Sequence, residues 1–297
     1  MLALLPLVGS GCATTSSSRV APTTQLGQRA YTISDGVTEA VIVPDWRRVM
    51  SLNRVGQKNV LFNSFKLPDT RSENVFANFG GEKAWLWPQD QWVNASGVLT
   101  MFPPPDDNGA SAGLNVVDVS HDTLTLETGV MKTAPVFMRR TYRIEKDGAL
   151  HVRTQTRPAD GAVVDTKWRV WSVLQLPRPL RVEARLKGEK RYKPMSSGVP
   201  LSSDGTTAVM HPFGATYGKV GLDADQLVAI YDTFRIVFTH TNPPEFVTGA
   251  ELAQLYVTNF SKTDPREEYI ELEFLAGPVK SPGVSALDVS IAIVPNP

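Results

Sequence analysis

The chain has 297 residues, of which 42% are hydrophobic and 20% charged, so it has enough apolar material for a sizeable core and too little charge for a disordered protein. Its 30 basic and 30 acidic residues cancel, and no long block of like charge is present, which argues against nucleic acid or an anionic membrane surface as a partner. The 22 glycines and 22 prolines are spread over the whole length, as is typical of a protein built from many short strands.

The first residues indicate an exported lipoprotein. Residues 1–8 are an apolar run, residues 9–11 are small, and Cys12, the single cysteine, is followed by a tract of Ala, Thr and Ser. This order is typical of a bacterial lipoprotein signal, in which the cysteine is lipidated, although no Lys or Arg precedes Cys12. A buried core cysteine is the alternative, but the polar tract argues against burial. No later segment approaches the length of about 18 apolar residues that a membrane span needs.

These features divide the chain into three parts. We expect a signal peptide at residues 1–12, a flexible tether at residues 13–27 and a single folded domain at residues 28–297. The expected location is the bacterial cell envelope. There the chain would be anchored to a membrane, on its periplasmic or extracellular side, through acyl chains on Cys12.

Beyond the tether, strand patterns follow one another. Apolar, β-branched or alternating residues mark strands at residues 40–44, 60–62, 124–128, 141–145, 150–154, 168–174, 227–231, 234–239, 269–275 and 287–294. A turn with Gly148 and a turn at Asp232-Thr233 predict two hairpins. The only plausible helix is a short one at residues 249–254. We therefore predict an all-β protein, a single antiparallel and helix-poor β-sandwich domain.

A tryptophan-rich segment is the most informative feature of the domain. Trp85, Trp87 and Trp92 fall within eight positions, beside Lys83 and Gln89. Flat aromatic faces next to polar side chains suit a sugar, whose C–H faces stack and whose hydroxyls need donors and acceptors. If the segment is extended, alternation places the lysine and the first two tryptophans on one face. We expect at least one tryptophan to line an open cleft with the lysine or the glutamine; a core tryptophan cluster is the alternative.

Four segments together carry a family resemblance. They are residues 41–62, with two strands and a turn; residues 80–89 followed by a Pro-Pro-Pro-Asp run; residues 139–176, with a hairpin and a strand; and residues 269–283, with an acidic strand and a Pro-Gly turn. Through them the sequence resembles the galactose mutarotase-like superfamily of aldose 1-epimerase-like proteins, from residue 40 to the C-terminus. More narrowly, it resembles an uncharacterised bacterial lipoprotein branch. The second and fourth segments are the more specific ones.

The resemblance implies a fold and a site. The fold is a β-supersandwich with a sugar cleft on one concave face. In mutarotases of this family, a glutamate on the acidic C-terminal strand takes the anomeric hydroxyl proton and histidines donate to the ring oxygen. Glu271 and Glu273 match the acidic strand. Because they are two residues apart they share one face, where mutual repulsion would raise one pKa; exposure of both to solvent is the alternative.

The histidines depart from the family pattern. The strand that would present one carries Trp171 instead, which we add to the candidate sugar-binding residues. His211 in a loop and His240 at a strand end are candidate catalytic partners, because sites gather on loops and strand ends. Lys83 is a further candidate proton donor.

No motif for a metal or cofactor is present. The sequence lacks CxxC, HExxH, a complete calcium loop, a phosphate loop and a Gly-x-Ser-x-Gly elbow, so we expect neither metal nor cofactor. The function expected first is a carbohydrate-binding cell-envelope lipoprotein. Two alternatives stay open: an aldose 1-epimerase-like isomerase that uses a glutamate base, and a non-catalytic structural protein of the envelope. The sequence leaves enzymatic activity undecided.

Overall fold

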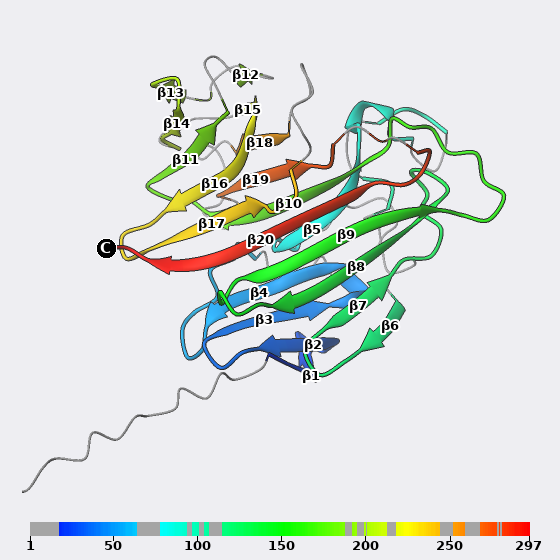
Figure 1. Cartoon of the computed structure of the whole chain (residues 1–297), viewed down its shortest axis with the longest axis horizontal. Helices are drawn as coiled ribbons and strands as arrows, with labels where there is room; N and C mark the ends of the chain where they lie inside the picture. Colours follow the sequence, from blue (N-terminus) through cyan, green and yellow to red (C-terminus); the bar gives the residue numbers. More distant parts are fainter. Residues whose placement is uncertain are drawn as a thin grey trace, which may run out of the picture.

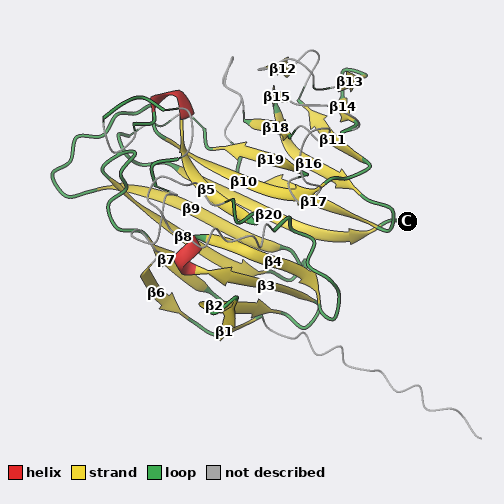
Figure 2. Cartoon of the chain, turned by 180° about the vertical axis from the view of Figure 1, so that it is seen from behind, coloured by secondary structure: helices red, strands yellow, loops and turns green. Residues whose placement is uncertain are grey.

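The computed structural model describes residues 18–63, 78–93, 97–100, 104–106, 115–187, 192–194, 199, 201–212, 218–243, 252–258, 268–277, 279 and 281–297. Within these residues the chain forms two large antiparallel sheets and two short 3₁₀ turns, η1 (Pro44–Trp46) and η2 (Gln89–Gln91). Figure 2 shows how little of it is helical. Neither turn has the length or the hydropathy to cross a membrane.

Each sheet has ten strands in the described part of the chain. The first sheet runs in the order β1 (Arg19–Gln25), β2 (Gln28–Ser34), β3 (Thr38–Val43), β4 (Arg48–Arg54), β5 (Glu82–Trp87), β10 (Arg169–Pro177), β19 (Tyr269–Leu275), β18 (Ala253–Val257), β15 (Gly218–Leu222) and β12 (Tyr192–Pro194). The second runs in the order β13 (Leu201–Ser203), β14 (Thr207–Met210), β11 (Arg181–Leu186), β16 (Ala224–Ile230), β17 (Phe234–His240), β20 (Ala286–Pro295), β9 (Leu150–Pro158), β8 (Val136–Ile144), β7 (Leu124–Glu127) and β6 (Asn115–Val119). In Figure 1 the C-terminal strand β20 lies beside β9, in the middle of the second sheet.

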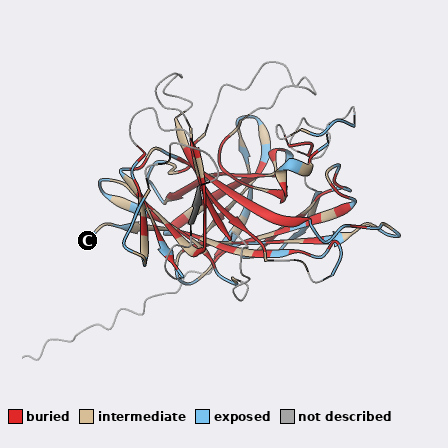
Figure 3. Cartoon of the chain, turned by 90° about the horizontal axis from the view of Figure 1, so that it is seen from above, coloured by how far each residue is buried: buried red, intermediate tan, exposed pale blue. Residues whose placement is uncertain are grey.

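Alternating side chains build the core between the sheets. On β8, Met138, Arg140 and Tyr142 are buried while Arg139 and Arg143 are exposed, as the period of two requires. The inner faces of both sheets contribute to one large apolar cluster. Figure 3 shows the buried residues along the strands and the exposed ones mostly at turns and loops. The predicted all-β, helix-poor sandwich is therefore confirmed.

One buried ion pair crosses this core. The Glu82 carboxylate of β5 binds the Arg140 guanidinium of β8 at 2.5 and 2.7 Å, and it accepts a hydrogen bond of 3.0 Å from Ser172 Oγ of β10. The Arg140 guanidinium also lies 5.1 Å from the centroid of the Tyr142 ring. Burial raises the pKa of the Tyr142 hydroxyl. The pair ties the tryptophan-rich strand of the first sheet to the second sheet.

Both predicted hairpins are confirmed. β8 and β9 pair throughout around Gly148, whose φ of 74° is the left-handed conformation that the turn needs. β16 and β17 pair around Asp232-Thr233, where the Tyr231 N–H donates to the Phe234 carbonyl at 2.9 Å.

Three predictions on local structure are wrong. Half of the expected tether at residues 13–27 is strand β1, which pairs with β2 through a turn at Leu26-Gly27, and Pro22 is tolerated there because β1 is an edge strand. Residues 60–62 form no ladder strand. The helix expected at residues 249–254 is contradicted at its end, where Ala253 and Gln254 begin β18.

Candidate functional site

The glycines before the tryptophan-rich strand fix where β5 begins. Gly80 and Gly81 have φ values of 83° and 74°. A Cβ on Gly80 would lie 2.0 Å from the Phe62 carbonyl oxygen, and one on Gly81 would lie 2.2 Å from the Val49 carbonyl oxygen. Only glycine allows so close an approach of two backbones. Strand β5 begins at the next residue, Glu82.

The strand sends alternate side chains to opposite sides of the first sheet. Glu82 points into the core, as its contact with Arg140 shows, so Lys83 and Trp85 point to the outer side. The register pairs Trp85 with Trp171 on β10, and residues directly opposite each other share a face. The expected placement of the lysine and tryptophans on one face is therefore confirmed.

The two glutamates of β19 share this outer side. Leu272 and Phe274 alternate with them and are fully buried in the core between the sheets. Val173 on β10 pairs with Glu273 on one side and with Lys83 on the other, so the register aligns these three residues in one row across the sheet. Their expected common face, opposite the apolar residues of the strand, is confirmed, and solvent exposure of both is excluded because Glu273 is fully buried and Glu271 is 9% exposed.

We define the polar face of the first sheet by these outward-pointing side chains. It consists of Lys83, Trp85, Trp171, Gln175, Lys219, Gln254, Tyr256, Glu271 and Glu273. Five neighbouring strands contribute, in the order β5, β10, β19, β18 and β15. The glutamates lie on the middle strand of the five.

Two lysines reach the glutamates from opposite flanks. Lys83 Nζ on β5 lies 3.8 Å from Glu271 Oε1, and 4.4 Å from the centroid of the Trp85 ring. Lys219 Nζ on β15 lies 2.8 Å from Glu273 Oε2, and 4.5 Å from the Trp171 ring. Each lysine thus spans one intervening strand and places its ammonium group beside a carboxylate and over an indole ring. Such burial of charged groups requires pairing of this kind.

The two carboxylates have different hydrogen-bond partners. Glu271 Oε1 accepts a hydrogen bond of 2.7 Å from Gln175 Nε2. Glu273 Oε2 accepts one of 2.7 Å from Trp171 Nε1, in addition to its contact with Lys219. Burial, opposed by the Lys219 ammonium and assisted by the neighbouring Glu271 charge, raises the pKa of Glu273 to about 7.

Two buried acceptors on the polar face have no hydrogen-bond partner. They are Glu273 Oε1 and Gln175 Oε1, both with side chains essentially inaccessible to solvent in the described structure. A buried acceptor without a donor costs about 1–3 kcal/mol. A ligand that offers hydroxyl groups, which both donate and accept hydrogen bonds, would supply the missing partners.

The aromatic residues form a packed cluster at one end of the polar face. The Trp85 ring meets Trp171 edge-on at 5.3 Å between centroids and Trp92 edge-on at 5.9 Å. Trp92 is 1% exposed, and its Nε1 donates to the Leu86 carbonyl. Trp85 and Trp92 are therefore buried in a packed cluster, which was the alternative to an open cleft. Trp87 is half-buried. A role of these tryptophans in ligand binding stays a prediction.

Gln89 and the half-buried Trp87 lie at the edge of this region. Gln89 begins the 3₁₀ turn η2 and is half-buried. The Arg169 guanidinium lies 4.2 Å from the Trp87 ring centroid and donates to the Ala276 carbonyl. At the exposed side of this turn, Lys167 Nζ donates a hydrogen bond of 3.2 Å to Gln91 Oε1.

The two candidate histidines lie at or after the ends of strands of the second sheet. His211 follows β14 and is exposed. His240 ends β17 with its ring 5.7 Å from that of Phe274, on the core side of β19 and opposite the polar face. Burial lowers the pKa of His240 to about 4. His240 therefore does not join the glutamates, and the cations that the structure describes beside them are the two lysines.

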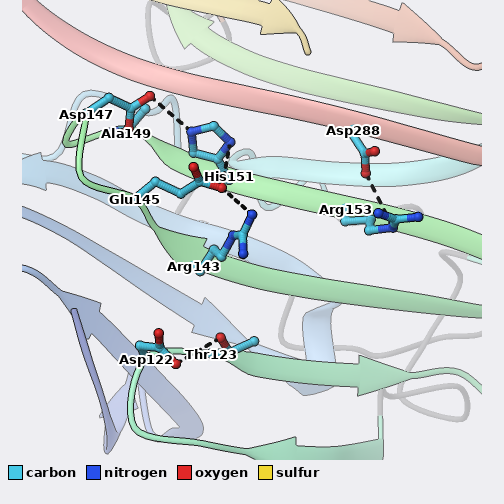
Figure 4. Close-up of polar contacts among 9 residues, drawn as sticks. All are labelled: Asp122, Thr123, Arg143, Glu145, Asp147, Ala149, His151, Arg153 and Asp288. Atoms are coloured by element: carbon cyan, nitrogen blue, oxygen red, sulfur yellow. Dashed lines mark hydrogen bonds and ion pairs between the residues drawn. The ribbon is translucent and has the colours of Figure 1, made fainter. Parts of the chain in front are cut away.

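The outer face of the second sheet provides a contrast. Figure 4 shows its polar contacts, among them Arg153 Nε at 3.7 Å from Asp288 and His151 Nε2 at 3.2 Å from Asp147. The Arg153 and Asp147 side chains are 58% and 59% exposed. Exposed pairs of this kind contribute about 0–1 kcal/mol. The polar face of the first sheet differs because its ion pairs are buried.

Sequence reasoning missed four residues of the polar face. They come from three strands and are Gln175, Lys219, Gln254 and Tyr256. Gln254 was assigned to the expected helix, and Tyr256 follows that segment closely. The alternation of Gln and Tyr with apolar residues at 253–257 was the available signal. Cys12 lies outside the described residues. No group of three or more potential metal ligands comes together in the part of the chain that the structure describes.

Comparison with known proteins rests on structure alone. No model of a known protein family matches the sequence. A search of curated proteins by sequence also gives no match.

Solved structures, in contrast, share the fold. A proposed mutarotase from Salmonella typhimurium superposes with a TM-score of 0.60 at 10% identity, over 94% of each chain. A proposed aldose 1-epimerase from Escherichia coli K12 gives a TM-score of 0.57 at 13% identity, over 90% of this chain and 99% of the other. Galactose 1-epimerase from Lactobacillus acidophilus gives 0.54 at 11% identity, over 95% and 99%. The chain therefore has a galactose mutarotase-like fold, as its sequence resemblance predicted.

Proposed function

We propose that the chain is a carbohydrate-binding protein whose ligand lies against the polar face of the first sheet. The observation that carries the proposal is the pair of glutamates on β19, each beside a lysine whose ammonium group lies over an indole ring, that of Trp85 or of Trp171. Carboxylates accept sugar hydroxyl bonds strongly, since charge-assisted hydrogen bonds are about twice as strong as neutral ones.

The unpartnered oxygens support the same ligand class. Gln175 Oε1 and Glu273 Oε1 are buried and have no hydrogen-bond partner, and a carbohydrate carries on one small, rigid ring several hydroxyl groups, each of which can donate or accept. Its C–H faces pack against indole rings such as those of this cluster. The similar solved structures support the proposal through their descriptions as mutarotase, aldose 1-epimerase and galactose 1-epimerase. These names belong to proteins that act on sugars.

Titration of monosaccharides against the intrinsic tryptophan fluorescence tests the proposal. Glucose and galactose should change the emission, because Trp171 donates directly to Glu273. In the Glu271→Gln variant, binding should weaken by about 1.5 kcal/mol or more, the low end for one hydrogen bond to a charged group. Glu145→Gln, on the outer face of the second sheet, is the matched control and should bind as the wild type does. An emission unaffected by any sugar would favour a non-catalytic structural role in the envelope.

A second candidate function is an aldose 1-epimerase-like isomerase. It is favoured by the two carboxylates of β19, which lie on one face in different hydrogen-bond environments and could divide the roles of proton acceptor and donor. Nuclear magnetic resonance of freshly dissolved α-galactose measures the approach to the anomeric equilibrium. A rate increase that is lost in Glu271→Gln would assign the activity, and binding without any rate increase would leave the protein a sugar-binding one.

Export and anchoring are part of the proposal. An apolar run and small residues precede Cys12, and a polar tract follows it, an order that favours lipidation of that cysteine in the cell envelope. Mass spectrometry of the protein from membranes of the expressing cells should find diacylglycerol on Cys12. A Cys12→Ala variant should lose the lipid and the membrane association, and an unprocessed N-terminus in the membrane-free fraction would contradict this assignment.

A further inference from the structure

We infer that Glu273 binds the ligand in its protonated form and donates a hydrogen bond from Oε1 to an oxygen of the carbohydrate, while Glu271 serves as the acceptor. This inference rests on the proposed function. It assigns different tasks to two residues that the sequence presents as equivalent, and it requires the ligand to place an acceptor, a ring or hydroxyl oxygen, against Glu273.

The two oxygens of Glu273 are in unequal surroundings. Oε2 is 2.8 Å from the Lys219 ammonium and accepts from Trp171 Nε1 at 2.7 Å, so two donors already occupy it. Oε1 has no hydrogen-bond partner, and the side chain is fully buried. A proton on Oε1 would use the free position, remove the buried charge and leave both existing contacts intact.

The charged and titratable groups around Glu273 come from four strands. Lys219 on β15 favours the carboxylate and Glu271 on β19 opposes it. Lys83 on β5 lies in the same row as Glu273, and Tyr256 on β18 pairs with Glu271. The facing residues of β10 are uncharged. Burial outweighs these charges and holds the pKa of Glu273 at about 7, so both forms are accessible near neutral pH.

Glu271 has the opposite environment. Its Oε1 accepts from Gln175 Nε2 at 2.7 Å and lies 3.8 Å from the Lys83 ammonium. Both neighbours are donors and suit an acceptor. If the protein is an epimerase, the ring oxygen takes the Glu273 proton together with the electron pair of the opening ring C–O bond. The anomeric hydroxyl then becomes a carbonyl and its proton passes to Glu271.

The pH dependence of sugar affinity tests the inference. Galactose and glucose are titrated against tryptophan fluorescence between about pH 5.5 and 8.5, and the wild-type Kd should rise up to about tenfold per pH unit once Glu273 ionises. In Glu273→Gln the amide accepts from Trp171 and Lys219 through its oxygen and donates from the other position. Its Kd should therefore vary by less than about twofold over the same range and equal the wild-type value at the acid end.

A second variant tests the inference while leaving Glu273 itself unchanged. Lys219→Met removes the ammonium that favours the Glu273 carboxylate, so the rise in Kd should move to higher pH. Glu145→Gln should follow the wild-type profile. Sugar binding that is independent of pH in the wild type, or lost at every pH in Glu273→Gln, would overturn the inference and leave the proposed function standing. Failure of every sugar to bind the wild type at any pH would overturn the proposed function itself.

Discussion

Glu273 is buried on the outer side of the first sheet, and His240 of the second sheet is buried in the core on the other side of β19. Burial shifts the pKa values of these two residues in opposite directions. It raises the pKa of the glutamate to about 7 and lowers that of the histidine to about 4, because in both cases it disfavours the charged form. As pH rises through the acidic range, folding stability falls through Glu273, since the folded state holds its proton longer than the unfolded state. Stability rises through His240, since the unfolded state binds the proton there.

Substitution of His240 separates the two effects. The folded-state pKa is about 4 and the ordinary value 6.5, so the histidine costs stability increasingly as pH falls below its ordinary value. At about pH 5 the cost relative to pH 7 is about 2 kcal/mol. Burial and the Lys187 charge outweigh the Asp225 charge and the backbone hydrogen bond at Asn242, which favour the imidazolium. In His240→Gln the free energy of unfolding should therefore decrease less on acidification than in the wild type, by about that amount.

Urea unfolding of both proteins at the two pH values measures the difference. Because each protein is compared with itself at another pH, any loss of packing in the variant cancels. Equal changes in unfolding free energy would mean that His240 is already protonated or solvated in the folded state.

At the scale of elements, β5 depends on the glycines before it. Gly80 and Gly81 lie where the backbone meets the Phe62 and Val49 carbonyls, at positive φ. Gly81 also joins the ladder around it, since its N–H donates to the Phe62 carbonyl at 2.7 Å and its carbonyl accepts from the Gln175 N–H at 3.0 Å. This turn sets the register that places Lys83 and Trp85 on the polar face.

Alanine at either glycine should destabilise the fold. The added Cβ would overlap a backbone oxygen at 2.0 or 2.2 Å, so the chain must shift as well as adopt a strained φ, and we expect a loss of at least about 2 kcal/mol. Gly129, where a Cβ meets nothing within 4 Å, is the control, and Gly129→Ala should change stability by less than about 1 kcal/mol. Thermal or chemical unfolding of the three variants measures these effects, and equal stability in all three would contradict the close approach.

Alternation predicted the elements well where apolar and polar residues follow one another along a strand. Residues 141–145, residues 150–154 and β19 are examples. The prediction failed for β1, which is largely exposed at an edge and contains Pro22, and for β18, whose Ala-Gln-Leu start is also a good helical turn. In both cases pairing with a neighbouring strand decided the structure, and local propensity did not.

At the scale of the whole molecule, the order of strands in the first sheet explains why the site could be predicted only in part. Glu271 and Glu273 were found through the family resemblance of their strand, and Lys83 through the tryptophan-rich segment. Lys219 and Gln175 join them only through the strand order β5, β10, β19, β18, β15. That order brings residue 83 beside residues 173 and 273, and such long-range pairing leaves no local pattern in the sequence. His240 does end a strand as expected, but that strand, β17, belongs to the second sheet, so the residue lies away from the glutamates for the same reason.

The core ion pair connects the two sheets directly beneath this site. Glu82 and Lys83 are neighbours in sequence on opposite faces of β5, one bound to Arg140 of the second sheet and the other beside Glu271. The Glu82 and Arg140 side chains are 0% and 2% exposed. A pair buried to this degree adds little stability over well-packed apolar residues, but either member alone would be an uncompensated buried charge.

A double-mutant cycle should therefore show strong coupling between the sheets. Glu82→Leu and Arg140→Met should each lower the free energy of unfolding by about 3–5 kcal/mol, whereas the double variant should lose less than the sum of the two. Arg139→Met is the control on the same strand, because Arg139 faces outward and pairs with Glu127 at 3.1 Å with a side chain that is 47% exposed. It should cost no more than about 1 kcal/mol. Additive losses in chemical unfolding would mean that the two side chains contribute independently and that the sheets are joined by apolar packing alone.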